Sequence, residues 1–377
     1  MKILYDLSYV QEDIYSSVYY HAKSTFEYLM NNIDDSIEVA LLVLRNVKVE
    51  DTILKLAKKI EYVDSRVDTK KYFKEVEEIG CNYDRVYFPY QPIGHIYKFG
   101  DKTDFYFTMY SLKELVFSKK GKYNKYDLLY QEGFLSHLKY FYRAFKRFSG
   151  IWYKETFNRM KNNLENAKKV ICVSNSTKED VIKTFKINED KLEVFYSPLK
   201  RVTDFSSTDL TYSNYFLFVS SSKYTKNTYS GLKALDLIYD NNIDYPMTVS
   251  VGHLPSKVYK KLRHKDKIIS LDYVTHYDLE YLYQNALALI YPSFYEGFGD
   301  ALLEAMKYKT RVIASNLKCL NELYPHALFF DPFNIKDIKE KILNYESIDK
   351  EMMYLDYQNV LAKSDSDRLK EVEFITK

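Results

Sequence analysis

The chain has 377 residues, of which 46% are hydrophobic and 28% charged, a composition typical of a folded protein rather than a disordered one. Its 55 basic and 52 acidic side chains give a formal net charge of +3, which is too close to neutral to favour a nucleic-acid partner. The 10 glycines form neither a G-x-G-x-x-G dinucleotide fingerprint nor a G-x-x-x-x-G-K-[ST] phosphate loop. We interpret the 39 tyrosines as a compositional bias.

Short apolar runs alternate with longer amphipathic stretches along the chain. Several runs are uninterrupted Val, Ile, Leu and Phe, which is typical of strands buried on both faces of a parallel sheet. Helical patterns lie between them, for example at 174–185 and 336–344. This alternation predicts α/β layers with crossover helices. The predicted strands are 2–4, 39–44, 85–88, 105–108, 169–173, 191–195, 215–219, 247–251, 268–271, 287–291, 311–314 and 328–330.

A polar stretch without clear periodicity, at 197–214, separates two similar halves. The pattern predicts an N-terminal Rossmann-like domain at 1–200 and a C-terminal one at 201–355, two doubly wound domains facing a cleft. Residues 356–377 are predicted to form a short helical tail that needs a surface to pack on.

Targeting and redox features are few. The three cysteines are scattered singly, and Cys172 lies in an apolar run, so we expect a buried thiol and a reducing compartment. The start of the chain shows no cleavage pattern, and there is no run of 18 apolar residues. We therefore expect a cytoplasmic protein.

The segment with the most chemical information is PSFYEGFGDALLEAM, at 292–306. A strand ends before it, Gly297 and Gly299 allow positive φ or close backbone approach, and a helix is expected to open near Asp300. Free N–H groups at a helix start form an anion site, and ligands of open α/β sheets bind at this edge. Glu304 follows Glu296 by eight residues, so we expect both carboxylates to face one ligand.

This segment resembles the E-x7-E signature of the family 4 retaining glycosyltransferases, also called glycosyl transferases group 1, which have the GT-B fold. Further similarity lies in VSNSTKED (173–180), FLFVSSSKYTKN (216–227), VSVGH (249–253), ISLDYVTHYDLEYLYQNALALIYPS (269–293) and RVIASNLKCLNEL (311–323). The resemblance is strong over 170–340. It implies two domains around a nucleotide-sugar site, with a C-terminal helix that crosses back to the N-terminal domain.

The resemblance assigns roles to residues of this chain. Glu296 would orient the donor sugar and Lys226 would neutralise the leaving diphosphate, and these two are the expected catalytic residues. Glu304 would hold the ribose, a task that suits a carboxylate acceptor. The other donor-binding residues implied are Gly297, Phe298, Gly299, Asp300, Leu302, Leu303, Lys223, Tyr273, Val274 and Gly252.

The chain departs from the family pattern mainly in its first half. The usual glycine-rich loop is replaced by a glycine-free stretch at 10–23. On the acceptor side, Tyr110 and Ser111 stand where the family has His and Asp. In the second half, Lys309 and Asp272 replace glycines of the family pattern.

Residues 137–162 mix aromatic side chains with seven Lys and Arg against a single Glu. They could form a basic aromatic helix in peripheral contact with the inner face of an anionic membrane, where lipid-linked acceptors lie. The alternative is a domain helix with its aromatics in the core and a solvated basic face. The nearby GKYNKY, at 121–126, is expected to be an exposed loop.

The sequence thus predicts a retaining glycosyltransferase that moves a sugar from a UDP- or GDP-sugar to a glycan or lipid-linked acceptor in polysaccharide synthesis. No metal or other cofactor is expected, because Lys226 and helix N–H groups could stabilise the leaving phosphate. The single D-x-D, Asp365–Asp367, is interpreted as a surface helix start. Two alternatives remain: a non-catalytic nucleotide-sugar-binding subunit, and an epimerase or phosphorylase on the same fold.

Overall fold

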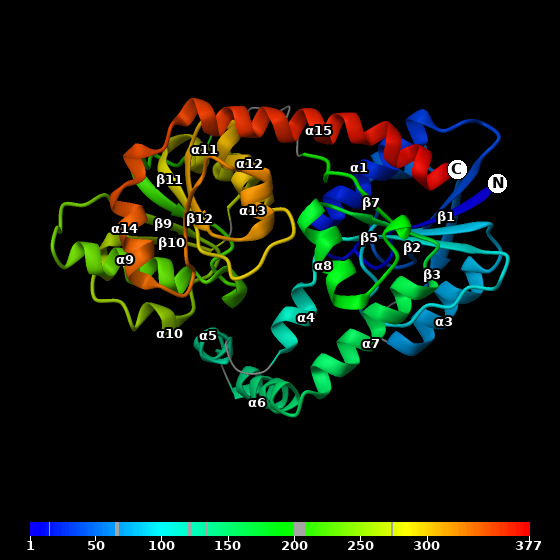
Figure 1. Ribbon diagram of the computed structural model, residues 1–377, viewed down its shortest axis with the longest axis horizontal. Coiled ribbons are helices and arrows are strands. Elements are labelled where there is room, and N and C mark those ends of the chain that lie inside the picture. Colours follow the sequence, from blue (N-terminus) through cyan, green and yellow to red (C-terminus); the bar gives the residue numbers. More distant parts are fainter. Residues whose placement is uncertain (15, 65–67, 120–122, 133, 200–207, 273) are drawn as a thin grey trace. The chain divides into compact units, whose positions relative to one another are not determined.

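The computed structural model describes all residues except 15, 65–67, 120–122, 133, 200–207 and 273 (Figure 1). The chain folds into two compact units. The N-terminal unit comprises Met1–Leu112, Lys154–Lys200 and Leu361–Lys377, and the C-terminal unit comprises Lys113–Tyr153 and Arg201–Val360. Each unit is built around its own parallel sheet, and this is the GT-B fold class expected from the sequence.

The N-terminal unit contains a seven-stranded parallel sheet in the order β3-β2-β1-β4-β5-β6-β7. Its central strands are buried along almost their whole length, because helices cover both faces. The strands are β1 Lys2–Asp6, β2 Glu38–Leu44, β3 Lys59–Val63, β4 Arg85–Phe88, β5 Asp104–Met109, β6 Lys169–Cys172 and β7 Leu192–Val194. The helices are α1 Ser17–Asn32, α2 Asp51–Leu56, α3 Thr69–Gly80, α7 Ile151–Asn166 and α8 Asn175–Phe185, with a 3-10 turn at Glu189–Lys191.

The C-terminal unit contains a six-stranded parallel sheet in the order β10-β9-β8-β11-β12-β13. The order reverses direction between β8 and β11, which makes this pair of strands the topological switch point. Helices α9 and α14 pack together on one face, and α11 to α13 lie on the other (Figure 1). The strands are β8 Tyr215–Phe218, β9 Thr248–Val251, β10 Ile268–Leu271, β11 Ala286–Tyr291, β12 Arg311–Ser315 and β13 Leu328–Phe330. The helices are α9 Thr228–Tyr239, α10 Ser256–Tyr259, α11 His276–Asn285, α12 Asp300–Lys307, α13 Lys318–Leu323 and α14 Ile335–Leu343, with 3-10 turns at Tyr224–Lys226, Lys265–Lys267 and Tyr345–Ser347.

One segment belongs to a different unit from the one expected. The predicted first domain, 1–200, included residues 113–153, but these fold with the C-terminal unit. They form α4 Lys113–Ser118, α5 Asn124–Leu129 and α6 Phe134–Phe148. Their aromatic side chains pack on the C-terminal unit, where Phe117 and Tyr126 share a buried cluster with Phe294. We call residues 113–153 the inserted segment. The expectation of an exposed loop at 121–126 was wrong for its second half, which begins α5 and buries Tyr126.

The tail is also longer than predicted. Helix α15 runs over Lys350–Thr376, so it begins within the C-terminal unit and ends in the N-terminal one, as a helix that crosses back should (Figure 1). The D-x-D therefore lies inside this helix and not at a surface helix start. Asp367 is buried and accepts a hydrogen bond from the Tyr196 backbone N–H at 3.0 Å, which explains why a carboxylate stands there.

The twelve predicted strands all exist, with ends shifted by up to two residues. The prediction missed β3, an edge strand whose sequence KIEYV is partly exposed. Residues 137–162 form parts of two helices, α6 and α7, because the chain turns at Gly150 with φ of 72°. In the described part of the chain, no helix is long and apolar enough to span a membrane.

Candidate functional site

The predicted catalytic residues follow neighbouring strands at the switch point of the C-terminal sheet. Lys226 ends the 3-10 turn after β8, and Glu296 lies in the loop after β11. The two loops are tied together, because the backbone N–H of Phe294 donates to the carbonyl of Thr225 at 3.0 Å. The carboxyl ends of these strands are therefore where a ligand of such a sheet would bind.

Lys226 and Glu296 form an ion pair in which Nζ lies 2.7 Å from Oε1. Tyr291, the last residue of β11, completes a triangle with them. Lys226 donates to the Tyr291 hydroxyl, and that hydroxyl donates to Glu296 Oε1 at 2.9 Å. The side chains of Lys226 and Glu296 are only 19% and 15% exposed, so the pair is largely shielded from water. An ammonium group has three N–H donors, and two of them are used in this triangle.

The electrostatics of the triangle keep Glu296 ionised. Burial opposes the charged form, but the charge of Lys226 and its hydrogen bond outweigh burial, so the pKa of Glu296 lies below its ordinary value. For Tyr291 the balance runs the other way. Burial, with the Glu296 charge beside it, raises the pKa of Tyr291 well above its ordinary value. At neutral pH the site therefore holds an ionised Glu296 carboxylate beside a neutral Tyr291 phenol.

Helix α12 begins directly after this loop, as the sequence predicted. Its first residue is Asp300, and its N-cap is Gly299, whose φ of 92° lies in the left-handed region. A Cβ atom on Gly299 would also lie 2.7 Å from the Leu320 side chain, so the φ angle and the limited space both favour glycine. Phe298, Leu302 and Leu303 are buried, so any ligand contact from these three would come from their backbone.

Glu304 lies further along α12 and is partly buried. Its Oε2 accepts a hydrogen bond from the Tyr283 hydroxyl at 2.9 Å, and Tyr283 is a buried residue of α11. This contact fixes the Glu304 carboxylate before any ligand is bound. It also gives Glu304 a structural partner that the sequence reasoning did not expect.

The other predicted donor-binding residues follow the same strand ends. Gly252 comes after β9 with φ of 94°, and a Cβ atom there would lie 3.0 Å from the backbone nitrogen of Ser221, so the two loops touch. Lys223 is exposed and is the N-cap of the 3-10 turn that Lys226 ends. Gly297 lies between Glu296 and Phe298, and Val274 precedes α11. Tyr273 lies outside the described residues.

The profile of the glycosyl transferases group 1 family matches residues 202–359 of this chain. Residues 202–359 are thus similar to a group 1 glycosyltransferase domain. The match covers every loop of the switch-point site just described, from Lys223 to Asp300. The resemblance seen in the sequence is thereby confirmed at the level of group 1, while assignment to family 4 stays a prediction.

Two curated relatives show what this chain is similar to over about half of its length. The O-antigen chain mannosyltransferase RfbU of Salmonella typhimurium is 30% identical over 222 residues, which is 56% of this chain and 60% of that protein. The O-antigen chain mannosyltransferase B of Escherichia coli is 28% identical over 198 residues, 48% of this chain and 52% of that protein. The matches thus span about half of each relative, rather than its whole length.

Solved structures are similar over the whole chain. Sucrose-phosphate synthase of Thermosynechococcus elongatus gives a TM-score of 0.67 at 15% identity, covering 99% of this chain and 98% of that one. HepE of Anabaena, crystallised with UDP and glucose, gives 0.64 at 13% identity, covering 100% and 99%. At such identities the likeness concerns the fold.

The predicted acceptor-side residues belong to the other unit. Tyr110 follows β5, and its hydroxyl donates to the Pro89 carbonyl at 3.0 Å. Its backbone N–H and that of Ser111 both donate to Gln91 Oε1, at 3.2 and 3.1 Å. These bonds hold the turn in place. The acceptor role of Tyr110 and Ser111 stays a prediction.

Sequence reasoning missed the two tyrosines, Tyr291 and Tyr283, that hold Glu296 and Glu304. A signal existed, since Tyr291 is the last strand residue before the loop that carries Glu296. This position of Tyr291 was overlooked because the abundance of tyrosine was interpreted as a compositional bias. Within the described residues, no group of three or more His, Cys, Asp or Glu could hold a metal ion.

Proposed function

We propose that this protein is a retaining glycosyltransferase that transfers a hexose from a UDP- or GDP-sugar to a glycan or lipid-linked acceptor in cell-surface polysaccharide synthesis. The observation that carries the proposal is the Lys226–Glu296 ion pair of 2.7 Å at the switch point. The two mannosyltransferase relatives support mannose as the sugar. The presence of UDP and glucose in HepE supports a nucleotide-linked donor.

In the proposed reaction the bond between the anomeric carbon and the diphosphate oxygen breaks, and the electron pair stays on the diphosphate. Among the residues that the structure describes, Lys226 gives two N–H donors to Tyr291 and Glu296, which leaves one for the departing phosphate. The N-termini of α9 and α12 add partial positive charge next to it. This fixed positive charge would stabilise the leaving group without a metal ion.

Glu296 would orient the sugar, and the acceptor oxygen would attack the face that the diphosphate leaves. The acceptor proton would pass to the departing phosphate oxygen, which balances charge without a separate base. Glu304, held by Tyr283, would accept hydrogen bonds from the ribose hydroxyls. A depressed pKa suits Glu296 to this role, because an ionised carboxylate only accepts hydrogen bonds.

A transfer assay with Glu296→Ala, Glu304→Ala and Lys226→Ala tests the proposal. We expect losses of at least tenfold in each variant, with EDTA leaving the wild-type rate unchanged. Wild-type transfer rates in all three variants would refute the assignment of this site. Nucleotide binding without turnover in the presence of acceptor would support a non-catalytic binding subunit, and an altered donor without transfer would support an epimerase.

A further inference from the structure

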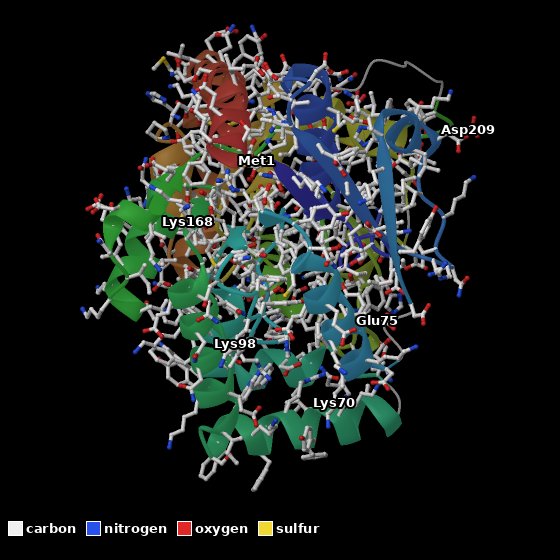
Figure 2. The ribbon with its side chains drawn as sticks, turned by 90° about the vertical axis from the view of Figure 1, so that its right-hand side faces the viewer. Met1, Lys70, Glu75, Lys98, Lys168 and Asp209 are labelled. Atoms are coloured by element: carbon white, nitrogen blue, oxygen red, sulfur yellow. The ribbon has the colours of Figure 1, made fainter. Side chains whose placement is uncertain are left out.

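Helix α6 exposes an unusual amount of aromatic surface. Large apolar side chains that gather on an exposed surface mark an interaction site more often than chance. Figure 2 shows side chains of this helix projecting at the lower edge of the view. Four of its aromatic side chains are nearly two-thirds exposed or more: Phe141 at 63%, Tyr142 at 63%, Phe145 at 64% and Phe148 at 69%.

These side chains occupy one side of the helix. At about 100° per residue, the four aromatics together with Lys139 and Lys146 fall within an arc of about 180°. Lys146 lies against the Tyr142 ring, with Nζ 5.5 Å from its centroid. We call these six residues the aromatic-basic face.

The opposite side of α6 is anchored to the protein. Tyr140 and Arg147 are buried there, and Arg147 donates to Asp127 Oδ2 at 2.6 Å. Arg143 contacts the same carboxylate at 3.5 Å. The helix is therefore packed on the side opposite its aromatic-basic face.

We propose that the aromatic-basic face docks on an anionic lipid bilayer. Phe and Tyr rings bury well at the boundary between headgroups and acyl chains, and lysines beside them gain energy from anionic headgroups. Helix α6 contains Lys139, Arg143, Lys146 and Arg147 and no acidic residue, so its charge complements such a surface. A second copy of the chain would bring like charges together and fits this face less well.

Helix α6 also contacts the loop that carries Lys226. Arg147, on its anchored side, donates to the Tyr224 hydroxyl at 3.0 Å, and Tyr224 is two residues before Lys226. Helix α6 would thus contact the bilayer with one side and the 3-10 turn that carries Lys226 with the other. Lipid binding needs no nucleotide, so the docking goes beyond the proposed function and can fail independently of it.

The test is co-sedimentation of the full chain with vesicles of phosphatidylcholine, with and without phosphatidylglycerol. We expect strong binding only when phosphatidylglycerol is present. The triple variant Phe141→Ser, Phe145→Ser, Phe148→Ser should bind at least tenfold more weakly. Lys139→Gln and Lys146→Gln should each weaken binding about fivefold, the factor expected for one charge at the surface.

The matched controls are Leu343→Ser, Leu355→Ser and Lys336→Gln, which change exposed side chains of the same unit outside this face. They should bind as wild type, and all variants should keep the wild-type melting temperature. The proposal would be overturned if the triple aromatic variant bound vesicles as strongly as the wild type. It would also be overturned if wild-type binding did not depend on phosphatidylglycerol. A wild-type dimer that ignores vesicles and becomes a monomer in the aromatic variant would overturn it as well, since the face would then join two copies.

Discussion

Arg147 donates a hydrogen bond of 3.0 Å to the hydroxyl of Tyr224, although 77 residues separate them in the chain. Arg147 belongs to the inserted segment, and Tyr224 belongs to the 3-10 turn that ends at Lys226. The same guanidinium donates to the Phe117 carbonyl at 2.9 Å. One buried arginine thus joins the inserted segment to the loop that carries the proposed catalytic lysine.

Replacing Arg147 with Met should lower the free energy of unfolding of the C-terminal unit by about 3–5 kcal/mol, because Asp127 would keep a buried charge without its closest partner. Urea unfolding followed by the fluorescence of Trp152, the single tryptophan, measures this loss. Its ring lies 4.8 Å from the Arg147 guanidinium and reports directly on the region.

Two further variants make this prediction specific. Lys309→Met breaks a pair with Glu351 in which the side chains are 44% and 72% exposed, and it should cost less than about 1 kcal/mol. The double variant Arg147→Met, Asp127→Leu should recover most of the loss, because no buried charge remains. A double variant as unstable as the single one would argue against this account.

The Tyr291 hydroxyl can be removed without removing its ring. Tyr291→Phe should keep the fold but lower the transfer rate about tenfold, or about 1.4 kcal/mol, because Lys226 and Glu296 lose a shared hydrogen-bond partner. Steady-state donor consumption measures the change. Tyr239→Phe is the control, since it removes a hydroxyl that bonds Pro246 away from the proposed site, and it should turn over at the wild-type rate. Equal rates for Tyr291→Phe and wild type would contradict a role for this hydroxyl.

The ion pair also predicts a pH dependence of stability. Because Lys226 lowers the pKa of Glu296, the stability from this carboxylate is present above its unfolded pKa of about 4.3 and is lost as the pH falls through the lower folded value. In Lys226→Met, burial would be opposed only by the Ser293 hydrogen bond and the Lys113 charge, so that pKa would rise. The variant should therefore lose about 1–3 kcal/mol at pH 7 and less at pH 4. Melting temperatures of both proteins at the two pH values test this, and a loss that does not depend on pH would refute it.

Lys309 has φ of 57°, the left-handed conformation that favours glycine, at a position where the family pattern has glycine. Lys309→Gly and Lys309→Ala both remove the exposed ion pair with Glu351, so comparing them isolates the backbone effect. We expect the glycine variant to be about 1 kcal/mol more stable than the alanine variant, the reverse of the usual order. Thermal unfolding of the two variants decides it. Higher stability of the alanine variant would show that the strain is negligible.

The sequence predicted the two sheets well because their strands are continuous apolar runs that admit few other interpretations. It failed for β3, since an edge strand needs only one buried face and KIEYV carries two charged residues. The sequence also could not show to which of the two units the inserted segment belongs. Its placement depends on contacts such as Phe117 with Tyr224, between positions far apart in the chain.

The part of the candidate site that could be predicted consists of residues that lie close together in the sequence. Glu296, Gly299 and Asp300 follow one another across a strand–loop–helix junction, and that pattern is visible in the sequence. The partners of the glutamates were not predictable, because Tyr283 and Tyr291 are chosen by packing between strands and helices. In a chain with 39 tyrosines, the place of Tyr291 at the end of its strand was the one hint, and nothing in the order of residues singles out Tyr283.

The most direct test of the central claim is a calorimetric titration of UDP and GDP, and of uridine and guanosine, into wild type, Lys226→Ala and the control Lys336→Ala. The account predicts that Lys226→Ala raises the Kd of the bound diphosphate at least tenfold, since a charge-assisted hydrogen bond contributes about 1.5–3 kcal/mol. Nucleoside affinity should be unchanged in that variant, and Lys336→Ala should match wild type throughout. Unchanged diphosphate affinity in Lys226→Ala, or failure of the wild type to bind either diphosphate, would contradict the assignment of this site.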